Sequence, residues 1–385
     1  MKNGKVHPII LRSCLLRPRL EASLTDAEVP APNSLPGGAE WTHRGIHVLL
    51  PLLLFLLLAA CAPKTVPPGE ATQESRLAED ALVMPDGARL PLERWLPDGA
   101  PEAVLIGLHG FNDYAHAFAM PGRWFAQHGM ALYAYDQRGF GRSDHAGLWP
   151  GTGALVTDLR TATRLIRARH PDTPVYLLGA SMGGAVILAA DGRGGLAGVD
   201  GAVLAAPAVW AIAEMPFYQR AALWLSVHTV PWMSLSGAGL DRLPSDNIPM
   251  LRRFGQDPLV ISDTRIDAIY GLTRLMGEAL AAGPALTVPT LALYGRRDEI
   301  VPPQPTEKLW RQMPAAHTRA LYDSGWHMML RDLHAPTVWA DIRAWIARGG
   351  TGPLPSGADA AAEAALEAGG IEPLPRPERI RAGVQ

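Results

Sequence analysis

The sequence predicts an α/β fold in which a mostly parallel, eight-stranded sheet is covered by helices on both faces and is interrupted by an inserted helical cap. Three observations lead to this prediction. Short apolar runs alternate with amphipathic helical patterns, the alternation stops over residues 209–283, and a strand pattern resumes at residue 290. Alternating strands and helices form parallel sheets because each connecting helix buries its apolar face on the sheet.

The strands are predicted from short runs of apolar residues. The first two flank Pro85-Asp86-Gly87, a strong turn signal, and should form an antiparallel hairpin. Most of the other runs are apolar throughout, as expected for strands that are buried on both faces. In chain order the eight strands span residues 81–84, 89–95, 103–108, 130–135, 174–179, 201–206, 290–294 and 318–322.

Two helical patterns alternate with these strands. Residues 157–170 place apolar residues at helical spacing with arginines on the other face, and residues 335–347 carry a stripe of tryptophan and isoleucine. Residues 209–283 are instead helix-like throughout and rich in large apolar side chains. We therefore expect a core of residues 80–208 and 284–348 and a cap of residues 209–283; the alternative is that the cap residues form ordinary core helices.

The composition limits which classes of function can be expected. Hydrophobic residues make up 48% of the 385 residues, which is enough for a sizeable core. A net charge of −2 gives no electrostatic reason to expect a nucleic-acid partner. The two cysteines, Cys14 and Cys61, cannot build a disulfide framework, and no Cys/His spacing suggests zinc. We expect neither a metal nor a cofactor.

The N-terminal region resembles a bacterial lipoprotein signal. Residues 48–60 form an almost wholly apolar run, shorter than the ~20 residues that a membrane-spanning helix needs. The run ends in Leu58-Ala59-Ala60-Cys61, which resembles a lipobox. We expect lipidation at Cys61 and a place in the bacterial cell envelope; Ala62, rather than Asp, favours the outer membrane if there are two. The alternative is a short uncleaved anchor with an incidental cysteine.

Three flanking segments follow from this division of the chain. Residues 1–61 are assigned to an N-terminal extension and lipoprotein signal. Residues 62–79 are polar and proline-bearing, and we expect a tether between the lipid anchor and the folded domain. Residues 349–385 are rich in Gly, Pro, Ala and Glu, and we expect a disordered tail because such a segment has little apolar bulk to bury.

A pentapeptide of the form G-x-S-x-G lies between a predicted strand and a predicted helix, at residues 179–183. In that context the serine occupies a sharp strand-to-helix turn, and its hydroxyl projects from the carboxyl edge of the sheet. The two glycines allow the strand and the helix to pass close to the turn, and the start of the helix stabilises negative charge nearby. Ser181 is therefore the predicted nucleophile.

A serine hydroxyl needs a base to take its proton and an acid to orient that base. In folds with this serine turn the chain order is serine, acid, histidine. Asp298 and His327 each follow a predicted strand, so both should return to the edge that carries Ser181. The rival acids are Glu299 and Asp323. The rival base, His334, should lie inside the following helix.

The oxyanion of an acyl-transfer reaction needs backbone N–H donors. Met182, directly after the nucleophile, should supply one donor, and Phe111, in the loop after the strand at 103–108, should supply the other. His109 opens that loop, and we expect it to hold the loop rather than to act in catalysis.

These motifs resemble the α/β-hydrolase superfamily, and within it the monoacylglycerol lipase/lysophospholipase-like group, also called the serine aminopeptidase S33 group. The resemblance extends from about residue 80 to residue 348, with Ala180 where that group commonly has His before the nucleophile and Asn112-Asp113 in place of a more usual acidic pair. The matching stretches are His109-Gly110-Phe111, DQRGFGRSD at 136–144, GASMGG at 179–184, SLSGAGLDRLPSDN at 234–247, QDPLV at 256–260, LYGRRDEIVP at 293–302 and GWH at 325–327.

The resemblance implies a serine carboxylic ester hydrolase that works through an acyl-enzyme, with a monoacylglycerol or lysophospholipid as substrate. Large apolar residues of the cap should line a channel for the acyl chain, unless they only pack the cap onto the sheet. They are Trp210, Met215, Phe217, Trp224, Trp232 and Met233. The alternative enzymes are a small-ester esterase, a proline-directed peptidase and a perhydrolase. A different class is a non-catalytic lipoprotein that binds acyl lipids.

Overall fold

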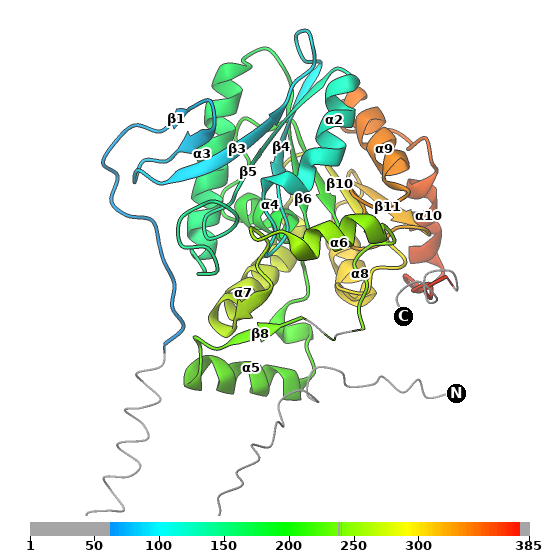
Figure 1. Cartoon of the computed structure of the whole chain (residues 1–385). Coiled ribbons are helices and arrows are strands. Elements are labelled where there is room, and N and C mark those ends of the chain that lie inside the picture. The colour runs from blue at the N-terminus through cyan, green and yellow to red at the C-terminus, as the bar shows by residue number, and fades with distance from the viewer. Residues whose placement is uncertain (1–61, 238, 240, 378–385) are drawn as a thin grey trace, which may run out of the picture.

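The computed structural model describes residues 62–377, except for 238 and 240. One sheet forms the centre, with strand order β1-β2-β3-β5-β4-β6-β7-β10-β11 (Figure 1). The strands from β5 to β11 in that order are parallel neighbours, and the first pairs are antiparallel. The prediction of a mostly parallel sheet is confirmed.

The strands are β1 (Arg76–Leu77), β2 (Ala81–Val83), β3 (Arg89–Trp95), β4 (Ala103–Leu108), β5 (Met130–Tyr135), β6 (Val175–Ala180), β7 (Gly201–Ala205), β10 (Thr290–Gly295) and β11 (Thr318–Tyr322). All eight predicted strands are present, with ends shifted by at most one residue. The number eight is wrong for the sheet as a whole, because β1 pairs with β2 as a ninth strand.

Helices cover both faces of the sheet because successive side chains of each strand point to opposite sides. The helices are α2 (Ala119–Gln127), α3 (Thr152–Arg169), α4 (Met182–Gly192), α7 (Ile266–Ala282), α8 (Pro303–Gln312) and α9 (Ala335–Ala347). In β4, Val104 and Ile106 belong to the apolar cluster that contains residues of α3, α4, α7 and α8, whereas Ala103 and Leu105 belong to the cluster that contains residues of α2 and α9. The sheet is therefore buried on both faces.

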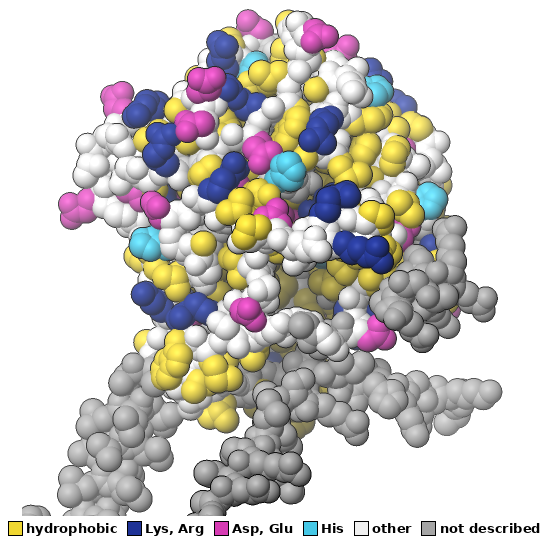
Figure 2. Space-filling view, viewed as in Figure 1, with side chains coloured by type: hydrophobic (Ala, Val, Ile, Leu, Met, Phe, Trp, Pro, Cys, Tyr) yellow, Lys and Arg dark blue, Asp and Glu magenta, His cyan; other side chains and the backbone are white. Residues whose placement is uncertain are grey.

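The cap lies between β7 and α7 and is smaller and less helical than expected. It comprises η3 (Ile212–Glu214), α5 (Phe217–Thr229), β8 (Ser234–Ser236), α6 (Ile248–Gln256) and β9 (Asp263–Arg265). Strands β8 and β9 pair antiparallel, and α7 buries Leu275 and Ala279 in the core cluster that contains α4. Figure 2 shows hydrophobic side chains along the lower edge of the molecule, where α5 lies in Figure 1.

Residues 62–79, for which we expected a tether, are held against the folded domain by backbone hydrogen bonds. The backbone N–H of Val66 donates to the carbonyl oxygen of Trp149 at 2.9 Å, and that of Thr72 donates to the carbonyl oxygen of Pro85 at 2.8 Å. Strand β1 then joins the sheet. A polar composition does not reveal these contacts, because backbone hydrogen bonds need no particular side chains.

The expectation of a disordered tail is wrong for residues 349–377. Helix α10 (Ala358–Glu367) packs against β11, and Ala362 and Ala365 are buried. Leu354 and Ile371, on either side of the helix, are buried as well. Alanine offers little apolar area per residue, but its small size lets the helix approach the sheet closely, and composition alone does not show that. Residues 378–385 lie outside the described part of the chain.

The predicted lipidation site Cys61 and the rest of residues 1–61 lie outside the described residues. Within residues 62–377, apart from 238 and 240, no helix is both long and apolar enough to cross a membrane.

Candidate active site

Ser181 occupies the turn between β6 and α4, with backbone angles φ 49° and ψ −111°. A positive φ is uncommon for a non-glycine residue and is strained backbone. The flanking glycines are required by close contacts. A Cβ on Gly183 would lie 2.0 Å from the carbonyl oxygen of Leu108, and one on Gly179 would lie 2.5 Å from the backbone nitrogen of Gly184. The turn therefore has the geometry that the G-x-S-x-G pattern predicts.

Asp298 and His327 follow β10 and β11 and meet at the carboxyl edge of the sheet. Nδ1 of His327 lies 2.8 Å from Oδ2 of Asp298. The other carboxylate oxygen accepts hydrogen bonds from the N–H groups of Ile300, at 2.8 Å, and Val301, at 2.9 Å. An ionised carboxylate can only accept, so Nδ1–H of His327 is the donor and Nε2 is left free of that proton.

The rival residues do not occupy this position. The carboxylate of Glu299 accepts from the N–H of Leu243 at 2.9 Å and pairs with Arg376. The side chain of Asp323 is 72% exposed and lies 3.5 Å from Arg296. His334 is exposed and lies at the N-cap of α9, one residue outside the helix in which it was expected.

The two expected oxyanion donors lie on either side of Ser181. Met182 is the first residue of α4, and the first N–H groups of a helix have no partner within it. On the other side, the loop after β4 passes so close that a Cβ on Gly110 would lie 3.5 Å from Cβ of Ser181. Phe111, next in that loop, lines the same cavity as Ser181.

His109 holds the loop after β4 in place. Its ring is fully buried; Nδ1–H donates to the carbonyl oxygen of Gly110 at 2.8 Å, and Nε2 accepts from the N–H of Gln137 at 2.9 Å. Burial lowers the pKa of His109, which keeps the ring neutral as this pattern requires. The Gln137 side chain returns a hydrogen bond to the carbonyl oxygen of His109 at 2.9 Å.

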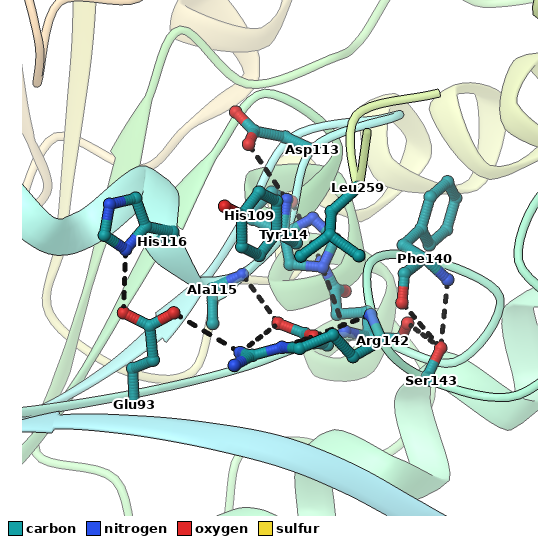
Figure 3. Close-up of polar contacts among 12 residues, drawn as sticks. Glu93, His109, Asp113, Tyr114, Ala115, His116, Phe140, Arg142, Ser143 and Leu259 are labelled. Carbon is teal, nitrogen blue, oxygen red and sulfur yellow. Dashed lines mark hydrogen bonds and ion pairs between the residues drawn. The ribbon is translucent and has the colours of Figure 1, made fainter. Parts of the chain in front are cut away.

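Asp136 and Arg142 brace the same loop and were not assigned a role from the sequence. The buried carboxylate of Asp136 accepts from the N–H of Ala115 at 2.9 Å, and from the N–H and Nε of Arg142 at 2.8 and 2.9 Å. The carboxylate of Glu93 lies between Arg142, at 3.3 Å, and His116, at 3.0 Å (Figure 3). In the sequence, the DQRGFGRSD stretch at 136–144 pointed to this region. It does not reveal the roles of Asp136 and Arg142, because their partners Ala115 and Glu93 are distant in sequence.

A cavity of about 920 Å³ connects Ser181 and His327 with the underside of the cap. Much of its wall is apolar and comes from both the core and the cap: Phe111, Trp210, Phe254, Leu272, Met276 and Met328. Its polar wall residues include Asn112, Asp113, Asp257 and Arg331, and Arg331 forms an ion pair with the buried Asp113. Among residues 62–377, apart from 238 and 240, no three His, Cys, Asp or Glu side chains form a group that could hold a metal ion.

The expectation that the large apolar cap residues line this cavity is wrong for most of them. Trp210 does so, but Phe217, Trp224, Trp232 and Met233 are exposed on the outside of the cap. Helical spacing shows which residues share a face of α5, but not whether that face points toward the sheet or toward solvent.

The cap is hydrogen-bonded to the site loops. Tyr114, in the loop after β4, donates its hydroxyl to Asp257 of the cap at 2.6 Å. Glu299, directly after Asp298, accepts from the N–H of Leu243 in the cap at 2.9 Å. The position of the cap and the shape of the site are therefore coupled.

Asp332 forms the third junction between the cap and the site. Its carboxylate accepts from the Ser245 hydroxyl of the cap at 2.5 Å and from the N–H of Trp326, the residue before His327, at 2.8 Å. Burial raises the pKa of Asp332 to about 7, against the opposite effect of these hydrogen bonds. This carboxyl therefore changes charge near neutral pH, between the cap and the His327 loop.

Comparison with known sequences finds one matching family and several related lipases. The family described as serine aminopeptidase, S33, matches residues 99–334. A monoacylglycerol lipase of Mycolicibacterium smegmatis is 26% identical over 282 residues, which cover 71% of this chain and 98% of that protein. The human monoglyceride lipase is 28% identical over 283 residues, which cover 69% of this chain and 89% of that protein.

Solved structures give the same fold. The monoacylglycerol lipase of Paleococcus ferrophilus aligns with a TM-score of 0.54 and 22% identity, over 68% of this chain and 99% of that one. A soluble variant of the Saccharomyces cerevisiae monoglyceride lipase, solved with a substrate analog, aligns with a TM-score of 0.59 and 19% identity, over 76% of this chain and 99% of that one. These similarities establish the architecture alone.

Proposed function

Because this chain belongs to the serine aminopeptidase S33 family, we propose that Ser181, Asp298 and His327 form its catalytic triad and that its substrates are monoacylglycerols or lysophospholipids. The chain is a serine hydrolase with the α/β-hydrolase fold. The observation that carries the proposal is the cavity of about 920 Å³. It is lined by Ser181 and His327, by many apolar side chains and by a few polar ones, such as Asn112 and Arg331.

Acylation begins when Oγ of Ser181 attacks the ester carbonyl carbon and Nε2 of His327 takes the hydroxyl proton. The N–H groups of Phe111 and Met182 stabilise the oxyanion that forms on the carbonyl oxygen. Asp298 stabilises the protonated imidazole and keeps its orientation. The ester C–O bond then breaks, His327 gives its proton to the departing alcohol oxygen, and the acyl group remains on Ser181.

Deacylation repeats these steps with water. A water molecule attacks the acyl carbonyl while His327 takes one of its protons. The bond to Oγ then breaks, His327 returns the proton to Ser181, and the fatty acid leaves. No metal or cofactor takes part in the proposed cycle.

The cavity supports a single-chain lipid ester. Its apolar wall suits an acyl chain, because each methylene that leaves water contributes about 0.8 kcal/mol. Met276 and Met328 suit a flexible chain, since methionine adapts to irregular shapes. Asn112 donates one amide hydrogen to Thr264, and Arg331 pairs with Asp113, but each keeps further N–H groups that can donate to a hydroxylated or phosphorylated head group. The named lipases from other organisms support the same substrate class.

A peptidase is the alternative that the family description suggests. An aminopeptidase needs an anionic group for the free amine of its substrate. In this cavity Asp113 is already paired with Arg331, and Asp257 accepts a hydrogen bond from the hydroxyl of Tyr114. This pairing favours a neutral or polar alcohol over a free amine.

The substrate proposal is tested with glycerol esters of increasing acyl length, each below its critical micelle concentration. We expect kcat/KM to rise with chain length up to at least medium chains, by at most roughly fourfold per methylene, and a monoacylglycerol to be cleaved faster than a triacylglycerol. A steady fall from acetyl upward would favour a small-ester esterase. Faster cleavage of prolyl amides than of any ester would favour a peptidase.

We further propose that the mature protein starts at Cys61, carries acyl chains there and resides in the cell envelope, in the outer membrane if the cell has two. The Leu58–Cys61 sequence at the end of an apolar run supports this proposal. Mass spectrometry of protein extracted from membranes tests it. An unmodified chain that begins at Met1 in the cytosol would contradict it.

A further inference from the structure

The loop after β4 contains a tight turn that carries the expected oxyanion donor. The N–H of Asp113 donates to the carbonyl oxygen of Gly110 at 3.3 Å, which closes a turn with Phe111 and Asn112 at its centre. Asn112 has a φ of 66°, whereas Phe111 is not among the residues with positive φ. A positive φ at the third position alone is typical of a type II turn, and asparagine tolerates it better than most residues. Asn112 therefore fits a backbone conformation that few other side chains adopt.

The peptide group between Gly110 and Phe111 is held at its oxygen. That carbonyl oxygen accepts from the N–H of Asp113 and, at 2.8 Å, from Nδ1–H of His109. A trans peptide group is planar, and its C=O and N–H point in opposite directions. The contacts that fix the carbonyl oxygen of Gly110 therefore also aim the N–H of Phe111, the expected oxyanion donor.

The cap contacts the same turn at Asn112. The carbonyl oxygen of Asn112 accepts from the N–H of Ile261 at 3.0 Å, and its side-chain amide donates to the hydroxyl oxygen of Thr264 at 2.6 Å. Thr264 lies in β9, and Ile261 lies just before that strand. Both the backbone and the side chain of this turn residue are thus bonded to one short segment of the cap.

The next residues of the loop are held by a neighbouring part of the cap. Tyr114 donates its hydroxyl to Asp257 at 2.6 Å, and the carboxylate of Asp257 also accepts from the N–H of Leu259 at 2.9 Å. The N–H of Tyr114 donates to the carboxylate of Asp113 at 2.9 Å (Figure 3). The cap is therefore docked on this loop at Tyr114 as well as at Asn112, and Asn112 is the contact next to the oxyanion donor.

We propose that Asn112 is a positioning residue, through which cap residues 261–264 hold the N–H of Phe111 toward the oxyanion. This inference rests on the proposed function, in which Phe111 is one of the two donors. A donor of this kind is effective because it is aimed before the charge forms. A cap that moves away from the turn releases Asn112, so the oxyanion hole is complete only while the cap is docked.

Asn112 also lines the cavity, and a contact with the head group of the substrate is the alternative role. The two roles predict different kinetics. A head-group contact acts on KM, and only for esters with a polar alcohol. A positioning residue acts on kcat for every ester, because every ester passes through the same oxyanion. A soluble ester without a hydroxylated alcohol, p-nitrophenyl butyrate, separates the two roles.

The experiment removes the hydrogen bond between Asn112 and Thr264 from either end. Thr264→Val removes the hydroxyl, and Asn112→Gly removes the amide but keeps a residue that adopts a positive φ. With p-nitrophenyl butyrate we expect each variant to lose about three- to tenfold in kcat, as suits the loss of one hydrogen bond, with KM within about twofold. The double variant should lose no more than the weaker single variant, because both changes remove the same contact.

Two control variants separate positioning from a general disturbance of the cap. Thr264→Ser keeps the hydroxyl and should recover most of the rate that Thr264→Val loses. Thr229→Val is the same substitution at an exposed site of α5, where the hydroxyl donates to the carbonyl oxygen of Leu225 at 2.8 Å. It should leave kcat within about twofold, because it does not contact the loop after β4.

A trifluoromethyl ketone inhibitor supplies a readout that a loss of fold stability does not move. Oγ of Ser181 adds to its carbonyl carbon while His327 takes the hydroxyl proton, and the carbonyl oxygen becomes an oxyanion in the hole. Its inhibition constant should therefore rise in Thr264→Val by about the factor by which kcat/KM falls. A lower kcat with an unchanged inhibition constant would place the effect elsewhere and would overturn the proposal.

Three further results would overturn it. They are an unchanged kcat in Thr264→Val, additive losses in the double variant, and a rise in KM that is confined to glycerol esters. If Asn112→Gly does not fold, Thr264→Val and Thr264→Ser decide the question by themselves. A wild type that hydrolyses no ester would contradict the proposed function, whereas an active wild type with unaffected variants contradicts the role of Asn112 alone.

Discussion

The core and the cap use the same kinds of apolar residue in opposite ways. In the core, Trp310 and Trp345 are fully buried, whereas in the cap Trp224 is 59% and Trp232 is 56% exposed. Core tryptophans contribute packing and burial that stabilise the fold. The exposed cap tryptophans leave more than half of their surface in solvent, so they contribute much less of this stabilisation.

The largest expected contrast between the two regions is in catalysis. Ser181→Ala should lower kcat on a soluble ester by up to about 10⁶-fold, because the acyl-enzyme can no longer form. Trp224→Ala should leave that rate within about twofold. The measurement is steady-state hydrolysis, together with labelling by a fluorophosphonate probe that reacts with the wild type only. Equal turnover by Ser181→Ala would contradict the assignment of the nucleophile.

The second contrast is in stability. Trp310→Ala should lower the free energy of unfolding by about 3–5 kcal/mol, because it leaves a cavity in the packed core. Trp224→Ala should change it by no more than about 0.5 kcal/mol, since that side chain is mostly in solvent. Urea unfolding of the two variants measures the difference. Similar losses in both would mean that the cap face is packed in solution.

A third prediction concerns the junction of the two regions at Asp332. Its pKa is about 7 in the folded protein against a usual value of 3.8, so the folded state binds an extra proton between these values. This group should therefore lower the free energy of unfolding as pH rises from about 4 to 7, by an amount on the order of 3 kcal/mol. The neighbouring titratable groups are Asp246 and His327.

Unfolding measured across that pH range in the wild type and in Asp332→Asn checks this prediction. The variant should lack the slope that Asp332 contributes, whatever its absolute stability. Identical slopes would show that Asp332 titrates outside this range.

The smallest expected effect is at the C-terminal segment, which reaches both regions. Arg376 pairs with Glu299 beside the site, at 2.5 Å, and with Asp241 of the cap, at 2.6 Å. Arg376→Ala should cost about 1 kcal/mol, because charge-assisted pairs that are partly exposed contribute modestly. The matched control is Arg89→Ala, which breaks an exposed pair with Asp80 and should cost less. Thermal unfolding compares them, and an equal cost would contradict a special role for Arg376.

The strands and the serine turn could be predicted because their signals are local. An apolar run such as residues 103–108 is buried on both faces wherever it lies in the sheet, and a G-x-S-x-G turn carries its own steric requirements at Gly179 and Gly183. The order of Asp298 and His327 along the chain follows from the same fold.

The support of the site could not be predicted in this way. The ring of His109 is held by a hydrogen bond from Gln137, and the carboxylate of Asp136 accepts one from Ala115. Each of these contacts joins residues that are 21 or more positions apart. The packing of α10 depends on the close approach of alanine to β11, which composition does not reveal.

By itself, the sequence determined the alternation of strands and helices, the serine turn and the chain positions of Asp298 and His327, because these rest on periodicity and on the backbone needs of single residues. Only the tertiary structure decided which face of α5 points outward, where residues 62–77 lie, and which residues line the cavity. An amphipathic pattern predicts that one face of a helix is apolar. What that face packs against depends on contacts between distant parts of the chain, which the pattern does not show.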